Sequence, residues 1–232
     1  MPVIATAGWS IPKTVAERFP SEGTSLERYA AVFPGVEINS TFYRSHRPST
    51  YEKWAASVDD DFRFSLKLPK TITHERRLAG IADLFAAFLE ETAPLGQKRG
   101  PLLCQLPPSL RFDASLVRTA FAAMRERYDG MIVIEPRHRT WTETEAYRVL
   151  QDHGVERVFA DPAPVWSKES FQVSPAYIRL HGSPEIYYSR YTPEEIAAYR
   201  AIVGPGSWCV FDNTASGAAI ANALAMIGQG EF

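Results

Sequence analysis

The chain has 232 residues, 45% of them hydrophobic, and carries a formal net charge of −2. This length suits one large domain, and α/β barrels are commonly single domains, so we expect one domain over residues 1–232. The near-neutral charge excludes a global electrostatic preference for nucleic acid or anionic membranes. Because there is neither a signal-peptide pattern nor an apolar run near the ~20 residues of a membrane span, we expect a cytoplasmic protein.

Eight short apolar runs alternate with helical patterns along the chain. The expected strands cover residues 3–7, 36–39, 62–68, 101–106, 131–135, 155–161, 176–181 and 208–211. Residues 162–175, after the sixth strand, are rich in proline and show no helical pattern. Alternating strands and helices imply a parallel sheet, and eight units imply a closed barrel. We therefore predict an α/β fold: a single (β/α)8 TIM-type barrel with an irregular unit after strand six.

A doubly wound open sheet is the alternative architecture. It would require a glycine-rich phosphate loop after the first strand, and Gly8-Trp9-Ser10 does not match that fingerprint.

Side-chain alternation predicts which residues face the barrel interior. On the seventh strand Ile178 and Leu180 point one way, and Arg179 and His181 point the other. Barrel interiors are normally filled by branched apolar residues. Charged residues that point inward from several strands therefore indicate a polar site at one end of the barrel.

The strand at residues 36–39 carries the first of these polar residues. Glu37 and Asn39 lie two positions apart and face the same side. A carboxylate in a buried strand is unfavourable unless it is paired. Glu37 is either part of a site or one half of a buried ion pair with Lys67 or Arg179.

Active sites of parallel barrels lie at the carboxyl ends of the strands. The polar residues at or near these ends are Glu37, Asn39, Lys67, Gln105, Glu135, Arg137, His138, Asp161, Arg179, His181, Asp212 and Asn213. His181 is the best single candidate for catalysis, because it ends a strand and precedes Gly182.

The leading hypothesis is an enzyme that acts on a small anionic or sugar-like substrate without a bound metal or other cofactor. Arg137, Arg179 and Lys67 would hold the anionic group through charge-assisted bonds. Glu37, Glu135 and His181 would transfer protons.

Two other functions are compatible with the same residues. In one, Glu37, Glu135, Asp161 and His181 bind a divalent metal for phosphodiesterase or isomerase chemistry. The nearby cations argue against this reading, and action on nucleic acid, which needs a basic rim, is not favoured. The other function is a barrel that binds a ligand without turnover.

Five segments resemble the YecE-like family, which is catalogued as a domain of unknown function. They are residues 36–44 (VEINSTFYR), Lys67 with 72–74, 103–108 (LCQLPP), 135–141 (EPRHRTW) and 177–182 (YIRLHG). The resemblance covers nearly the whole chain and implies a TIM-type barrel, but it implies no reaction.

The motif residues that the resemblance places at the site largely coincide with the polar strand ends. They are Glu37, Asn39, Tyr43, Lys67, His74, Gln105, Glu135, Arg137, His138, Trp141, Asp161, Arg179, His181 and Asn213. We expect Glu37, Glu135 and His181 to be catalytic and the others to bind substrate. The chain departs from the family at residues 212–214, where Asp-Asn-Thr stands in place of an Asn-Asn-His run.

Overall fold

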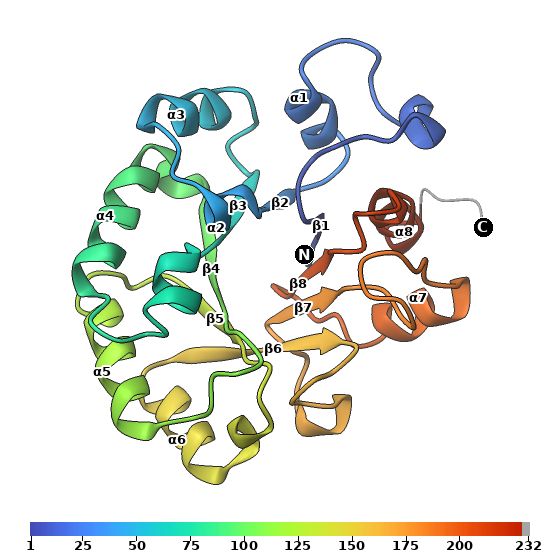
Figure 1. The fold of residues 1–232 in the computed structure, drawn as a ribbon. Helices are drawn as coiled ribbons and strands as arrows, with labels where there is room; N and C mark the ends of the chain where they lie inside the picture. Colours follow the sequence, from blue (N-terminus) through green and yellow to red (C-terminus); the bar gives the residue numbers. More distant parts are fainter. Residues whose placement is uncertain (229–232) are drawn as a thin grey trace.

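The computed structural model describes residues 1–228, and eight parallel strands form its sheet (Figure 1). The strands are β1 (Val3–Thr6), β2 (Gly35–Ile38), β3 (Arg63–Lys67), β4 (Arg99–Gln105), β5 (Ile132–Glu135), β6 (Val155–Asp161), β7 (Tyr177–Leu180) and β8 (Trp208–Phe211). Their order around the sheet is β1-β8-β7-β6-β5-β4-β3-β2. The predicted (β/α)8 barrel is therefore confirmed.

The barrel closes between β1 and β2 through a narrow seam. A single parallel bridge joins Ala7 to Glu37, and the Gly8 amide donates to the Glu37 carbonyl at 2.9 Å. Gly35 allows the close approach, because a Cβ there would lie 2.7 Å from Val3 Cγ1. The sheet is thus nearly closed, which rules out the open doubly wound alternative.

Helices surround the sheet, with α3 to α6 on one side of the view in Figure 1 and α7 and α8 on the other. They are α1 (Ser25–Ala30), α2 (Ser40–Tyr43), α3 (Pro48–Ala56), α4 (Ala82–Thr92), α5 (Ala114–Arg125), α6 (Thr144–Asp152), α7 (Pro193–Arg200) and α8 (Ala218–Met226). The connection after β6 contains only a 3-10 turn, Lys168–Ser170, which confirms the irregular unit. No helix within residues 1–228 has the length and apolar character needed to cross a membrane.

Two apolar layers divide along the predicted alternation. Ile178 and Leu180 belong to the cluster between the strands and the helices. The barrel interior holds a second cluster, which contains Ala5, Leu103, Val133, Val158, Ala160, Tyr177, Trp208 and Val210. Tyr177 stacks on Trp208 with ring centroids 6.0 Å apart. Charged side chains lie beyond this interior cluster, toward the carboxyl ends of the strands.

Several connections contain helical turns that the sequence pattern did not predict, and two of these turns follow the carboxyl ends of strands. Helix α2 begins directly after Asn39, and its Thr41 hydroxyl lies within hydrogen-bond distance of the carbonyl oxygens of Ile38 and Lys67. This contact joins the turn to the ends of β2 and β3. After β3, a π-helical turn covers Thr71–Glu75. Such single turns are too short to produce a helical hydrophobic period.

Candidate functional site

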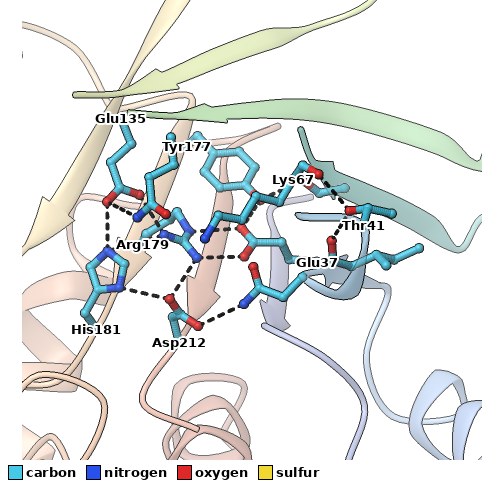
Figure 2. A network of polar contacts seen from close by, with 12 residues as sticks. Glu37, Thr41, Lys67, Glu135, Tyr177, Arg179, His181 and Asp212 are labelled. Carbon is cyan, nitrogen blue, oxygen red and sulfur yellow. Dashed lines mark hydrogen bonds and ion pairs between the residues drawn. The ribbon is translucent and has the colours of Figure 1, made fainter. Parts of the chain in front are cut away.

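A fully buried arginine stands at the centre of the polar end of the barrel (Figure 2). Arg179 donates from Nε and Nη2 to the two carboxylate oxygens of Glu37, at 3.0 and 2.8 Å. Its Nη1 reaches Glu135 Oε2 at 2.7 Å, and its Nη2 also reaches Asp212 Oδ2 at 2.8 Å. One guanidinium thus joins three carboxylates, from β2, β5 and the end of β8.

Glu37 has only buried partners. Besides Arg179 it accepts a hydrogen bond from Tyr177 at 2.9 Å, and that hydroxyl lies 2.7 Å from Ser65 Oγ. The alternative in which Glu37 forms a buried ion pair is therefore what the structure shows, with Arg179 as the partner. Burial and the Glu37 carboxylate raise the pKa of Tyr177 well above its ordinary value, so this phenol stays protonated.

Glu135 connects the buried arginine to the rim. Its Oε1 accepts from Gln105 at 3.0 Å and from Arg137 Nε at 2.9 Å. Burial alone would raise the pKa of Glu135, but Arg179, His181 and Arg137 together hold it well below its usual range. The Arg137 side chain is 18% exposed, so this cation reaches solvent, whereas Arg179 is fully buried.

His181 has partners for both of its protonation states. Nδ1 lies 3.0 Å from Asp212 Oδ2, and because a carboxylate only accepts, this nitrogen carries a proton. Nε2 lies 3.1 Å from Glu135 Oε1 and 3.2 Å from Arg137 Nη2. A protonated Nε2 donates to Glu135, and a neutral one accepts from Arg137. Nε2 is therefore the nitrogen that can gain and lose a proton in place.

The charges around His181 favour its protonated form. Burial lowers the pKa of His181, but Glu135 and Asp212 more than offset this effect, so the pKa is raised. For the Asp212 carboxyl the directions are reversed: burial raises its pKa, but the charges of Arg179 and His181 outweigh burial and lower the pKa overall. The Asp212 Oδ1 atom accepts a hydrogen bond from Asn39 at 3.2 Å, which ties the end of β2 to this pair.

Lys67 differs from the other cations of the site. Its side chain ends over the Phe42 ring, with Nζ 4.4 Å from the ring centroid. Burial and the Arg179 charge lower the pKa of Lys67 to about 8, against the opposing pull of Asp212, Glu37 and Glu135. The site therefore contains one amine that is partly unprotonated near neutral pH.

Three residues expected to bind substrate lie outside this group. Trp141 is fully buried, and its Nε1 donates to the Leu110 carbonyl at 3.1 Å. Asp161 accepts from the Tyr191 hydroxyl at 2.8 Å. Asn213 donates to Asn222 Oδ1 at 2.9 Å and to the Ser189 carbonyl. These side chains support packing and loops.

The remaining expected residues lie at the rim. His74 is half-buried beside Phe42, near enough to Lys67 and Arg137 that burial and these charges lower its pKa. His138 accepts from the Thr140 amide at 3.2 Å and caps a 3-10 turn, Arg139–Thr142. Tyr43 is 70% exposed and packs edge-on against Phe42.

Asp212 was among the polar strand ends but not among the residues expected to be catalytic or to bind substrate, although it contacts both Arg179 and His181. Alternation could have selected it, because Trp208 and Val210 of the same strand line the interior. The family pattern directed attention to Asn213 instead.

The site residues are a poor fit for a metal ion. Within residues 1–228, no group of three His, Cys, Asp or Glu side chains has an arrangement that holds one. Arg179 lies between the carboxylates of Glu37, Glu135 and Asp212, where a cation would have to bind. The guanidinium already supplies the positive charge that these carboxylates need.

Comparison with known proteins gives the family. The family model described as "Protein of unknown function DUF72" matches residues 3–231. The chain belongs to the DUF72 family.

The chain resembles two curated relatives. It is 35% identical over 161 residues to the "UPF0759 protein YecE" of Escherichia coli strain K12, an alignment that covers 68% of this chain and 58% of YecE. It is 25% identical over 152 residues to the "UPF0759 protein YunF" of Bacillus subtilis strain 168, with 62% and 53% covered. The resemblance to the YecE-like family is therefore confirmed, and the aligned part spans little more than half of each curated relative.

Solved structures agree on the barrel. A DUF72 family protein from Thermotoga maritima matches with a TM-score of 0.82 and 26% identity, covering 98% of each chain. One from Enterococcus faecalis matches with a TM-score of 0.80 and 21% identity, covering 99% of this chain and 95% of its own. A xylose isomerase-like TIM barrel fusion protein shares the fold at a TM-score of 0.54 and 15% identity, with 97% and 41% covered. The description of the DUF72 family names no reaction, so any activity has to be argued from the geometry of the site.

Proposed function

We propose that this DUF72 barrel is an enzyme that acts by acid–base chemistry on a small anionic or sugar-like substrate at the carboxyl end of its strands. The observation that carries the proposal is the buried ion cluster of Arg179, Glu37, Glu135 and Asp212. Burying such charges costs several kcal/mol per ion, and apolar residues of similar volume are often at least as stable. The cluster occupies the end of the barrel where TIM-barrel enzymes place their active sites.

Arg137 is the group that best fits an anionic part of the substrate. Glu135 orients its guanidinium through Nε and Nη2. The side chain is 18% exposed, so it is partly open to a ligand from solvent. A planar guanidinium held in this way suits a phosphate or carboxylate.

His181 is the proposed acid–base residue. Its Nε2 lies 3.2 Å from Arg137 Nη2, so a substrate held by Arg137 lies close to the nitrogen that exchanges its proton. Asp212 fixes the ring through Nδ1. In this proposal Glu37 and Glu135 keep Arg179 in place and stabilise positive charge on the imidazole. They position the site, and His181 performs the proton transfer that the sequence assigned to all three.

Proton nuclear magnetic resonance in D2O tests the proposal. The protein is incubated with sugar phosphates, free sugars and small hydroxy acids, and both deuterium uptake at carbon and new products are recorded. We expect at least one compound to exchange or to be converted, and His181→Gln to slow that reaction by about 10²–10⁴-fold. His153→Gln, at the end of α6 and away from the cluster, serves as the matched control.

Two outcomes would count against the proposal. If no compound reacts although some stabilise the protein, the site is a ligand-binding barrel without turnover. If His181→Gln reacts as fast as His153→Gln, the acid–base role of His181 is refuted.

A further inference from the structure

Lys67 combines burial with an amine that has no hydrogen-bond or ion-pair partner among residues 1–228. It is the last residue of β3, and the residue is only 8% exposed. Its Nζ has an aromatic face, that of Phe42, as its neighbour, and Figure 2 shows its side chain extending toward the ion cluster without an ion pair. Buried ammonium groups are normally paired. An unpaired one at the active end of a barrel therefore needs an explanation.

The amine is not completely sealed from solvent. In residues 1–228, the fully buried side-chain nitrogen and oxygen atoms without a hydrogen bond belong to Asn39, Arg157, Trp166 and Asn213. Lys67 Nζ is not among them, so it keeps some contact with solvent.

The surroundings of Lys67 increase the share of its unprotonated, nucleophilic form. Burial and the neighbouring Arg179 lower its pKa to about 8. Roughly a tenth of the amine is then unprotonated at neutral pH, against well under a thousandth for an ordinary lysine. A desolvated lysine beside a second cation is a known arrangement for activating an amine.

Lys98 shows that burial of a lysine does not by itself leave an unpaired amine. Its side chain is 15% exposed, yet Nζ donates to the carbonyl oxygens of Ala55 and Val58 and pairs with Asp60 at 3.3 Å. Lys70 is about half exposed and pairs with Glu75. Lys67 makes no such contact with residues 1–228, so no acceptor holds its N–H groups and fixes the protonated form.

We propose that Lys67 forms an imine with the carbonyl carbon of a small aldehyde or ketone substrate. This inference rests on the proposed function and deepens it, because it assigns a carbonyl group to the substrate of the same site. The substrate class is a small carbonyl compound with an anionic or hydroxylated end that Arg137 can hold.

The reaction balances with the groups at hand. The Nζ lone pair forms a C–N bond, and the carbonyl π electrons move to oxygen, which takes up a proton to give a carbinolamine. The hydroxyl then leaves as water with a second proton, which protonated His181 can supply, while Nζ loses one proton. The product is a protonated imine, which accepts electrons from the neighbouring carbon. The carboxylates of Glu37, Glu135 and Asp212 lie close enough to stabilise this positive charge.

Reductive trapping on the unmodified protein tests the inference. Limiting formaldehyde, the smallest carbonyl probe, is added with cyanoborohydride at pH 7.5, and peptides carrying each lysine are quantified by mass spectrometry. Glyceraldehyde and dihydroxyacetone phosphate are used in parallel. We expect Lys67 to be modified at least tenfold faster than Lys98 and faster than the exposed Lys70. Lys67→Arg should lose this fast phase while the other lysines react as before.

The outcomes separate this inference from the proposed function. If formaldehyde modifies Lys67 no faster than it modifies Lys70, the inference is overturned, whether or not Lys67→Arg folds. Deuterium exchange that depends on His181 but occurs without trapping at Lys67 would retain the acid–base enzyme and remove the imine. Fast trapping at Lys67 by all three probes supports the imine even if the deuterium panel contains no substrate.

Discussion

Arg179 and Glu37 form a fully buried, bidentate ion pair between β7 and β2. These two strands do not pair with each other in the sheet. A second contact, from Asn39 to Asp212, joins the end of β2 to the residue after β8. Both contacts cross the seam where β1 and β2 share a single bridge. The polar cluster therefore helps to close the barrel and also forms the floor of the proposed site.

Arg179→Met should strongly destabilise the protein. The change leaves the carboxylates of Glu37, Glu135 and Asp212 buried without their common partner, which we expect to lower the free energy of unfolding by about 3–5 kcal/mol at pH 7. Part of this loss should be recovered at lower pH as the carboxylates take up protons. Urea unfolding measures both effects.

Two variants control the Arg179 experiment. Arg148→Met, on the exposed face of α6, should change stability by less than about 0.5 kcal/mol. Adding Glu37→Met to Arg179→Met should restore part of the lost stability, because it removes one of the uncompensated charges. A single Arg179→Met variant as stable as Arg148→Met would show that the cluster does not hold the barrel together.

The protonation of His181 should make stability depend on pH. Because the pKa of His181 is raised above its ordinary 6.5, the folded protein binds more protons than the unfolded chain just above that value. The stabilisation is fully present below about pH 6.5 and is lost as the pH rises through the folded-state pKa.

Urea midpoints between pH 6 and 8 check this dependence. Wild type should lose stability relative to His181→Gln as the pH rises across this range, and His153→Gln should follow wild type. Parallel curves for wild type and His181→Gln would mean that the pKa of His181 is not raised.

Trp141→Phe should affect stability but not ligand binding. Trp141 is buried against Phe112, with ring centroids 5.2 Å apart, and its Nε1 donates a hydrogen bond to the Leu110 carbonyl. Losing this donor and part of the ring should cost about 1–3 kcal/mol. Thermal shifts caused by ligands should keep their size. If the variant is as stable as wild type but shows no thermal shift with ligands, Trp141 takes part in ligand binding.

Lys67→Met should change stability little or raise it, whereas Lys98→Met should lower it. Lys67 is a buried amine without a polar partner in the described part of the chain, so an apolar replacement should leave stability within about 1 kcal/mol of wild type or raise it. Lys98→Met leaves the carbonyls of Ala55 and Val58 without donors and should cost about 1–3 kcal/mol. Denaturant unfolding of both variants measures these changes. A large drop in the free energy of unfolding for Lys67→Met would show that the Lys67 amine stabilises the fold.

Strand alternation predicted the centre of the site from sequence. On β7 it placed Arg179 and His181 opposite Ile178 and Leu180, and the structure has them so. The period of two is fixed by backbone geometry, which makes it reliable wherever one face of a strand is apolar. The eightfold repeat of strand and helix likewise led to the barrel.

The same alternation explains why two of the residues expected to bind substrate lie outside the ion cluster. Asp161 lies on the same face of β6 as Phe159, which packs toward the helices. Its side chain therefore points away from the barrel interior. Asn213 follows β8 on the face opposite to Asp212. Trp141 is a different case, because it lies in a turn whose direction depends on tertiary packing rather than on a period. The contacts that set the pKa of Lys67 also join distant strands and have no local signature in the sequence.

The most direct test of the central claim is the binding of a small anion at the mouth of the barrel. Melting temperatures of chelator-treated wild type, Arg137→Gln and Arg148→Gln would be compared across phosphate, sugar phosphates, sugars and divalent metals. A ligand at a hundred times its Kd stabilises by about 2.7 kcal/mol, a clear shift of several degrees. The account predicts that phosphorylated compounds stabilise wild type and Arg148→Gln but not Arg137→Gln. Equal shifts in all three proteins, or a response to metals alone, would contradict it.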